Sequence, residues 1–465
     1  MASSWLEGLA GKRILILNWR DPWHPLAGGA EQYCWEVATR LATAEAKVTL
    51  FAASVRGRPA EEATGGVQLL RRGGTFTIYV RAAWYLMWHR RRVDAVVDCQ
   101  NGIPFFAPLF LMNRAVAVIL LVHHVHQEQF STRFKWPMTW VGRVLEGPCS
   151  RWVYRRRPIV AVSPSTRANV RQRLRLRGPI FVVPNGLGPD GLGPASVPAD
   201  PGPRLVYVGR LVPHKRLELL LDAFAQIRPS CPELTLDIAG TGPCLESLTS
   251  YADNLGVSTV VRFRGRVSDR ERRDLLSRAW LMVIPSKQEG WGLTVLEANR
   301  YGCPALGFRV PGLLDSIVHG QNGWLVDEPL QLGGAITTAL QALALPGARL
   351  NQAERCREWA RSFSWQRSAE WLASIITAHR YAPLRSQVTD LATVAILEMH
   401  GECAQAVKRL PPTCLWSQRG RQLDILVYGM DTQEVAPWLA TLGFQGKLAT
   451  RVACSRDLLL GPFPA

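Results

Sequence analysis

Short apolar runs that end in a loop and continue into a helical stretch recur along this chain. Arg13–Leu17 is the first such run, and a loop over Asn18–Gly29 leads from it to an expected helix over Ala30–Ala42. Continuously apolar runs of this length are typical of parallel strands that are buried on both faces. Strands that alternate with helices in this way predict a doubly wound α/β sheet.

The same alternation continues in two blocks that a linker separates. In the first block, further strands are expected over Val48–Ala52, Asp94–Asp98, Val116–Val122, Ile159–Ser163 and Phe181–Pro184. Residues 185–203 are rich in Gly and Pro and are expected to be a linker. In the second block the expected strands are Arg204–Val208, Thr235–Ala239, Val261–Phe263, Leu281–Pro285, Pro304–Gly307 and Gly323–Val326. Its expected helices are Arg216–Ile227, Cys244–Leu255, Asp269–Ala279 and Leu293–Tyr301.

A chain of 465 residues is too long for one hydrophobic core. We expect a Rossmann-like N-terminal domain over residues 1–190 and a second Rossmann-like domain over residues 191–364. A closing helix over residues 365–382 is expected to pack back on the first domain. Residues 385–465 form an extension to which the sequence assigns no role. There we expect a helix over Asp390–Leu410, a strand over Gln422–Tyr428 and a helix over Gln433–Leu442.

Basic residues are concentrated in the first part of the chain. The formal net charge is +18, and residues 1–190 hold 26 Lys and Arg against 12 Asp and Glu. This excess predicts an acidic partner, which is an anionic lipid, a nucleic acid or a phosphorylated substrate. Phe130–Arg157 mixes Trp and Tyr with Arg, which suits a membrane interface. A solvated helix that packs its Trp residues on the core explains the same pattern equally well.

The cysteines and the apolar runs indicate the cellular compartment in which the protein resides. Ten cysteines are scattered without the spacing of a metal site, which is typical of a reduced, intracellular protein. Met1–Gly11 lacks the pattern of a signal peptide, and the longest apolar runs, Ile103–Met112 and Ala115–Val122, are too short to span a bilayer. We therefore expect a cytoplasmic protein, and a membrane-interface role of Phe130–Arg157 would place it peripherally on the inner face of a membrane.

The segment from Glu289 to Glu297 predicts a site for a phosphorylated sugar. Gly290 and Gly292 let backbone amides approach a ligand, and the expected helix after them offers its N-terminus to a phosphate. Each glutamate can accept hydrogen bonds from a pair of sugar or ribose hydroxyls. The alternative is an ordinary glycine turn with a glutamate that only pairs with the helix dipole.

Three other segments place polar groups after strands of the second block. Arg210 and Lys215 follow the strand Arg204–Val208, where they can neutralise a diphosphate as it leaves a sugar carbon. The turn Asp237–Pro243 is weaker, because glycines there can serve packing alone. Residues 262–269 are expected either to face a nucleobase edge or to be an ordinary strand and turn.

In the first block, Gly28 and Gly29 follow the first strand and are expected near a diphosphate. His123, His124 and His126 follow a buried strand. A contact from His123 to the substrate sugar or the acceptor is favoured over a metal site, since a second ligand cluster is missing from the sequence around them. The sequence therefore predicts that no metal is bound.

These motifs resemble those of family 4 glycosyltransferases over roughly residues 12–380. The resemblance rests on Gly209-Arg210 with Lys215, on the Glu289-x7-Glu297 motif, and on Val310–Asp315 running to His319–Gly323. Gly28–Glu31 and Val183–Gly186 support it in the first block. It implies the GT-B fold, with two Rossmann-like domains that face each other across a cleft.

The resemblance also implies a role for each matching position. Arg210 and Lys215 would bind the nucleotide diphosphate, Glu289 the donor sugar and Glu297 the ribose. The remaining contacts to the nucleotide sugar would come from Gly28, Gly29, Gly292, Leu293, Thr294 and Val267, the last of these at the base. His123 would contact the donor sugar or the acceptor and, with Arg210, Lys215 and Glu289, complete the catalytic set.

The implied reaction is transfer of a hexosyl or N-acetylhexosaminyl group with retention of configuration. The donor would be a nucleotide diphosphate sugar such as a UDP or GDP sugar, and no cofactor would be required. The basic charge and the basic aromatic stretch Phe130–Arg157 favour an acceptor that is acidic, lipid-linked or a natural product. Two departures, Asp315 in place of Glu and Leu187-Gly188 in place of an acidic residue, leave the acceptor open. A non-catalytic nucleotide-sugar-binding protein, a basic nucleic-acid-binding protein and a phosphorylase or epimerase of the same fold remain alternatives.

Overall fold

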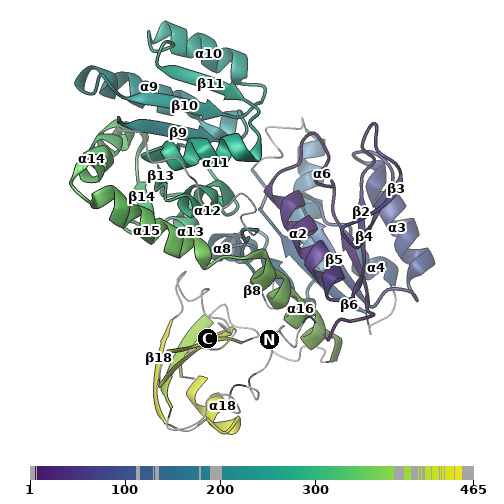
Figure 1. The fold of residues 1–465 in the computed structure, drawn as a ribbon. Helices are drawn as coiled ribbons and strands as arrows, with labels where there is room; N and C mark the ends of the chain where they lie inside the picture. Colours follow the sequence, from purple (N-terminus) through teal and green to yellow (C-terminus); the bar gives the residue numbers. More distant parts are fainter. Residues whose placement is uncertain are drawn as a thin grey trace. The chain divides into compact units, whose positions relative to one another are not determined.

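The computed structural model divides the chain into two compact units. Unit 1 comprises Met1–Gly186 with Trp365–Ala465, and unit 2 comprises Leu187–Ser364 (Figure 1). The structure describes residues 6, 8–111, 116–128, 130, 136–176, 180–188, 202–381, 392–399, 407, 410, 414–419, 421–428, 430, 432–433, 435–444 and 446–452. Each unit is considered by itself below.

Unit 1 is built on a sheet of eight strands. They are β1 (Arg13–Leu17), β2 (Lys47–Ala52), β3 (Glu61–Thr64), β4 (Val67–Arg71), β5 (Ala95–Gln100), β6 (Ala117–Val122), β7 (Ile159–Ala161) and β8 (Ile180–Val182). The spatial order is β3-β4-β2-β1-β5-β6-β7-β8, and only β3 runs antiparallel to its neighbour. The order reverses between β1 and β5, which is where ligands bind in doubly wound sheets.

The helices of unit 1 connect these strands. They are α2 (Gly29–Thr43), α3 (Thr77–His89), α4 (Ala107–Leu111), α6 (Met138–Val144), a π-helix (Leu145–Cys149), α7 (Ser150–Val153) and α8 (Pro164–Gln172). After unit 2, α16 (Trp365–Tyr381) returns and packs on α2, with the rings of Tyr33 and Trp365 5.6 Å apart. The Ser368 hydroxyl donates to the carbonyl of Pro184 at 2.6 Å, which ties α16 to the end of β8.

Unit 2 is a parallel sheet of six strands. They are β9 (Arg204–Val208), β10 (Thr235–Ala239), β11 (Val261–Gly265), β12 (Leu281–Ile284), β13 (Ala305–Phe308) and β14 (Gly323–Val326). Their order, β11-β10-β9-β12-β13-β14, is the Rossmann order with its reversal between β9 and β12. Alternate residues of β9 enter different cores: Leu205 and Tyr207 one, Val206 and Val208 the other.

Helices cover both faces of this sheet. They are α9 (Leu217–Ile227), α10 (Leu245–Asn254), α11 (Asp269–Arg278), α12 (Leu293–Arg300), α13 (Leu313–Ser316), α14 (Leu332–Ala344) and α15 (Ala348–Arg361), with short 3₁₀ turns at Pro213–Lys215, Arg228–Ser230 and Pro329–Gln331. The two doubly wound sheets predicted from the sequence are therefore confirmed.

The C-terminal extension forms a third sheet. Its antiparallel strands are β15 (Ala392–Glu398), β16 (Leu415–Arg419), β17 (Gln422–Tyr428) and β18 (Lys447–Val452), in the order β16-β17-β15-β18, with α18 (Val435–Thr441). The helix predicted over Asp390–Leu410 is wrong over β15, which pairs on both sides with β17 and β18. Thr393, Val394 and Ile396 are β-branched and favour a strand, and the sheet around β15 decides between the two patterns.

Candidate functional site

The loops that follow β9 and β12 meet at the reversal point of the unit 2 sheet. Register pairs Leu281 of β12 with Leu205 of β9, so both strands end at the same edge. Arg210 lies in the loop after β9, and Glu289 lies in the loop after β12. The two loops that the sequence singled out separately therefore belong to one crevice of the kind that binds ligands in this fold.

Lys215 and Glu289 form an ion pair in this crevice. The Nζ of Lys215 donates to Oε1 of Glu289, and the two side chains are only 15% and 14% exposed. The Ser286 hydroxyl donates to the same oxygen at 2.7 Å. Burial alone raises the pKa of Glu289, but Lys215 and Ser286 outweigh it and hold this pKa below its usual value. The carboxylate is therefore ionised at neutral pH and able to accept hydrogen bonds from hydroxyls.

Gly312 allows the backbone of Glu289 to take this position. The N–H of Glu289 donates to the carbonyl of Pro311 at 3.2 Å. Gly312 has φ +84°, and a Cβ placed on it would lie 2.4 Å from the carbonyl oxygen of Glu289. The Val310–Asp315 motif therefore acts as a support beneath the glutamate.

The N-terminus of α12 faces the loop that carries Glu289. Gly292 precedes the helix in a left-handed conformation (φ +84°), and Leu293 and Thr294 are its first two residues, whose N–H groups have no partner within the helix. Glu297 follows one turn later. Nη1 of Arg272 lies 3.7 Å from Oε1 of Glu297. Burial raises the pKa of Glu297 above its usual value although Arg272 and Arg300 oppose the shift.

Glu297→Gln is expected to stabilise the ligand-free protein at neutral pH and to weaken its binding of nucleotide sugars. A raised pKa in the folded state means that ionised Glu297 disfavours folding, and this penalty appears as pH rises through that pKa. Thermal unfolding at pH 7 and at pH 4 measures the effect, which should vanish at the lower pH. Equal stability of both proteins at pH 7 would contradict the expectation.

Glycines after β9 and β10 serve close packing of the two loops. A Cβ on Gly240 would lie 1.8 Å from the carbonyl oxygen of Gly209, and one on Gly242 would lie 2.2 Å from that of Leu211. The turn Asp237–Pro243 thus has a packing role, which is one of the two interpretations that the sequence left open. Arg210 itself is exposed, and the Tyr207 hydroxyl donates to its carbonyl at 3.1 Å.

The segment expected at a nucleobase lies after β11. Val267 is half-buried against the core that contains Val206, and Ser268 caps α11 by accepting from the N–H of Glu271 at 3.2 Å. Strand, turn and cap explain this segment structurally. The contact of Val267 with a base stays a prediction.

In unit 1, Gly28 and Gly29 lie at the N-terminus of α2. Oε2 of Glu31 accepts from the N–H of Gly28 at 2.7 Å, so one amide at this end has a partner within the protein. Asn185 lies beside Gly29, and its Oδ1 is buried without a hydrogen-bond partner among the described residues. This helix end therefore offers backbone N–H groups next to an unused side-chain acceptor.

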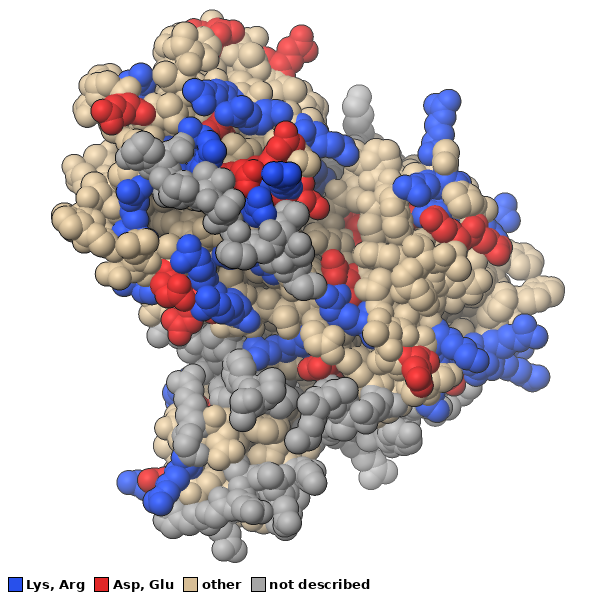
Figure 2. All heavy atoms as spheres, viewed as in Figure 1, with Lys and Arg blue, Asp and Glu red and all other residues tan. Residues whose placement is uncertain are grey.

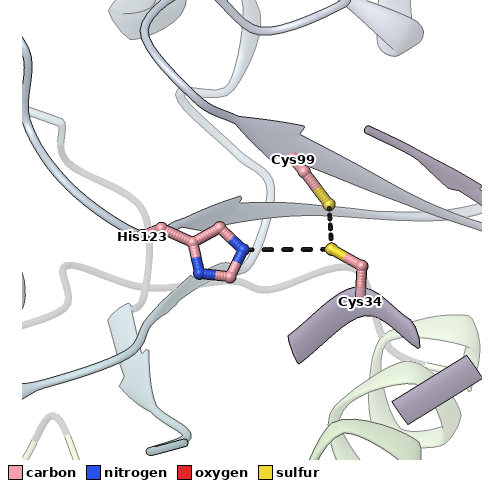
Figure 3. A group of neighbouring side chains, drawn as sticks. All are labelled: Cys34, Cys99 and His123. Carbon is pink, nitrogen blue, oxygen red and sulfur yellow. Dashed lines mark hydrogen bonds between the residues drawn. The ribbon is translucent and has the colours of Figure 1, made fainter. Parts of the chain in front are cut away.

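His123 lies at the end of β6 with its ring turned into unit 1. Figure 3 shows the imidazole beside Cys34, with Nε2 3.9 Å from Sγ of Cys34, which is in turn 3.4 Å from Sγ of Cys99. Burial, with the nearby His126, lowers the pKa of His123 to about 3. The ring is therefore neutral at neutral pH and can serve as a hydrogen-bonding group but not as a cation.

Within the described part of the chain, Cys34, Cys99 and His123 form a cluster whose thiol and imidazole groups are the ligands that soft metals prefer. Their ligand atoms all lie within 4.8 Å of one another, and all three side chains are buried. His126, another of the three histidines that follow β6, is not in this group: its Nδ1 lies 3.0 Å from the carbonyl oxygen of His124. The absence of a bound metal stays a prediction from the sequence.

We expect the thiol of Cys99 to resist alkylation in the native protein. Burial raises its pKa well above the usual value, and only the thiolate reacts at a useful rate. Cys149, Cys231 and Cys244 are partly exposed and should be modified before Cys99. Peptide mass mapping after brief iodoacetamide treatment, with and without urea, measures the order. Early modification of Cys99 would contradict the buried cluster.

Two buried carboxylates were missed by the sequence interpretation. Glu146, in the π-helix, accepts from the N–H of His126 at 2.6 Å and from the Gln127 side chain at 2.7 Å, and so holds the loop after β6. Asp98 accepts from the N–H groups of Phe105 and Ala107, and burial raises its pKa to about 6. A single acidic residue within an apolar run matches no sequence motif. Its structural role becomes visible only from its hydrogen-bond partners in the folded chain.

The Trp residues of the basic aromatic stretch do not pack on the core. Trp136 is 83% exposed, Trp140 60% and Trp152 63%. The interpretation that this stretch buries its Trp residues is therefore wrong for these three, whereas Phe134 and Lys135 lie outside the described residues. Among the helices of the described residues, none has both the length and the apolarity to cross a membrane.

Comparison with known sequences assigns both halves of the chain. Residues 27–190 match the family described as Glycosyltransferase Family 4, and residues 194–362 match Glycosyl transferases group 1. The D-inositol 3-phosphate glycosyltransferase of Streptomyces avermitilis is 31% identical over 229 residues, which are 45% of this chain and 49% of that protein. A GDP-mannose-dependent alpha-(1-6)-phosphatidylinositol monomannoside mannosyltransferase of Mycolicibacterium smegmatis is 31% identical over 189 residues, 39% and 49% of the two chains. The chain thus spans about half the length of the curated relatives it matches.

Solved structures share the fold. Sucrose-phosphate synthase from Thermosynechococcus elongatus superposes with a TM-score of 0.63 at 20% identity, over 77% of this chain and 96% of that one. The Anabaena protein HepE in complex with UDP and glucose gives 0.58 at 17% identity, over 78% and 98%. Together with the two family matches and the two Rossmann-like sheets, this similarity assigns the chain to glycosyltransferase family 4, with the GT-B fold.

Proposed function

We propose that this chain is a retaining glycosyltransferase that moves a hexosyl or N-acetylhexosaminyl group from a nucleotide diphosphate sugar to an acceptor hydroxyl. The observation that carries the proposal is the Lys215–Glu289 pair at the reversal point of the unit 2 sheet. A relative named as GDP-mannose-dependent and a structure with bound UDP support a nucleotide sugar as the donor. The acidic, lipid-linked or natural-product character of the acceptor rests on the basic charge of residues 1–190 and on the basic aromatic stretch Phe130–Arg157.

The ligand-free ion pair suggests how the donor is held. Glu289 is ionised and half of a buried pair, so sugar hydroxyls that donate to it replace contacts already made within the protein. Lys215 and Arg210 lie on the loop after β9, where they can neutralise the diphosphate. Leu293 and Thr294 supply N–H groups from the helix end, and Glu297 can accept from the ribose hydroxyls.

The proposed reaction is a front-face substitution through an oxocarbenium-like state. The bond between the anomeric carbon and the diphosphate oxygen breaks, and its electron pair stays on that oxygen. The acceptor oxygen forms the new bond on the same face, and its proton passes to the leaving diphosphate. Cations fixed where this charge develops lower the barrier, which is the role assigned to Lys215 and Arg210. Neutral His123 is proposed to hold a sugar or acceptor hydroxyl, and no metal or other cofactor takes part.

The test is binding and hydrolysis of UDP-, GDP-, ADP- and TDP-linked sugars by the wild type, Arg210→Ala and Glu289→Ala. Selective binding of one donor, with turnover lost in both variants and unaffected by EDTA, is expected. Binding without any turnover, with or without candidate acceptors, would favour a non-catalytic nucleotide-sugar-binding protein. If neither variant differs from the wild type, the assignment of this crevice fails.

A further inference from the structure

Unit 1 contains an apolar cavity that the donor site does not use. Its volume is about 500 Å³, within the range of about 300–1,000 Å³ for small-molecule sites. Sixteen residues from α3, α4, α6 and the segments beside them line it, and none has a charged side chain. The one hydroxyl, that of Tyr79, already donates to the carbonyl of Ile103 at 3.3 Å. A ligand in this cavity therefore finds almost no polar side chain to orient it.

Buried polar and glycine contacts fix the walls of the cavity. Asp98 holds the N–H groups of Phe105 and Ala107 at 2.8 and 3.0 Å, and the Tyr154 hydroxyl donates to the same carboxylate. Elsewhere in the lining, a Cβ on Gly142 would lie 2.6 Å from the ring of Phe130, so glycine is required for this ring to pack on α6. The cavity is thus a defined feature of the fold and not a packing gap.

The cavity opens to the surface through large apolar side chains. Val80 and Trp84 of α3 line it and are each 59% exposed, and Leu109 and Met138 line it from α4 and α6 and are also exposed. Trp88 lies one turn after Trp84 on α3, Trp136 and Trp140 flank Met138 at the start of α6, and all three are exposed. Exposed apolar surface of this extent marks a binding site, and Trp is enriched where protein meets lipid head groups.

Arginines accompany this apolar surface. Arg81 lies on α3 between Val80 and Ala82, Arg90–Arg92 follow α3 directly, and Arg143 lies on α6, all with exposed side chains. Figure 2 shows basic side chains projecting at the edge of the molecule where Figure 1 places α3. An apolar cavity surrounded by basic side chains complements a molecule that has a hydrocarbon chain and an anionic head group.

We propose that this cavity binds the hydrocarbon chain of a lipid-linked acceptor whose head group is anionic. The inference rests on the proposed function, in which the chain transfers a sugar to an acceptor. It narrows that acceptor to the lipid-linked class and sets aside the soluble natural product. A rigid small molecule would need polar groups for orientation, which the lining lacks, whereas a hydrocarbon chain requires none. The exposed arginines then hold the head group at the mouth of the cavity.

The experiment is calorimetric titration of the full chain with decyl and dodecyl phosphate below their micelle concentrations. Each buried methylene should tighten binding roughly three- to four-fold, so dodecyl phosphate should bind about ten-fold more tightly than decyl phosphate. Ala83→Trp fills the cavity from α3 and should weaken dodecyl phosphate binding at least about ten-fold. Ala342→Trp places the same side chain on an exposed position of α14 and should have no effect.

Val80→Glu provides a second variant that does not depend on filling the interior, because Val80 is exposed. It places a carboxylate at the mouth and should weaken dodecyl phosphate binding as well. Equal affinity for both chain lengths, or wild-type affinity in Ala83→Trp or in Val80→Glu, overturns the proposal. Nucleotide-sugar binding should be unchanged in all three variants, so loss of the donor site and loss of the lipid site are separate results.

Discussion

Replacing Lys215 with alanine is expected to lower kcat/KM for sugar transfer by roughly 10²- to 10³-fold, the typical loss when one fixed stabiliser of transition-state charge is removed. The effect should fall mainly on kcat, because the leaving diphosphate gains charge as the sugar bond breaks. Steady-state kinetics with the donor identified by the nucleotide-sugar panel measures it. Lys287→Ala is the matched control, because this exposed lysine lies two residues before Glu289. Its bond to His214 comes from the backbone N–H, which the substitution keeps.

The same substitution should destabilise the ligand-free protein by about 3 kcal/mol, since it leaves the Glu289 carboxylate in place without its cation. Because the pKa of Glu289 is lowered in the folded state, the stability it contributes is present above the unfolded pKa and is lost as pH falls through the folded one. In a double-mutant cycle, Lys215→Ala and Glu289→Ala should show a coupling of about 0.5–3 kcal/mol. Additive effects would contradict a functional pair.

Gly312→Ala is expected to destabilise unit 2 and to lower activity roughly 10²-fold, whereas Gly320→Ala should leave activity intact. Both glycines have a positive φ, +84° and +77°, which L side chains rarely adopt, so each alanine costs about 1–3 kcal/mol in backbone strain. Only Gly312 has the Glu289 carbonyl oxygen where the new Cβ would be, which adds about 1–3 kcal/mol and displaces the glutamate.

Thermal unfolding and donor kinetics of the two glycine variants separate these contributions. The difference between them reports mainly the contact with Glu289, because both substitutions also carry the strain of a positive φ. If both variants lose the same stability and neither loses activity, the Val310–Asp315 motif does not support Glu289. If Gly320→Ala alone inactivates the protein, the crevice is assigned to the wrong loop.

The sequence predicted most of unit 2 because its strands and helices are local patterns. Strand boundaries at Arg204–Val208 and Thr235–Ala239 agree with the structure to the residue. The position of Arg210 and Glu289 at strand ends followed from the same patterns. Their meeting in one crevice required the sheet order, which periodicity does not give.

The parts that the sequence did not predict depend on packing between distant segments. No helix was predicted over Thr77–His89, because apolar residues occupy several of its faces, including the exposed Trp84 and Trp88, and leave no clear stripe. The cavity behind this helix was therefore also unforeseen. The direction of His123 into unit 1 likewise depends on Cys34, which lies 89 residues away along the chain.

The return of α16 to unit 1 has a consequence for how the protein is made. Residues 1–186 leave the ribosome long before Trp365 is synthesised, and until then the part of α2 that packs on α16 has no cover. Unit 2 must emerge, and can fold, inside this delay, which brings its two ends together and shortens the effective loop that unit 1 has to close. Unit 2 thereby acts as a folded spacer during synthesis, and the domain that begins first is completed last.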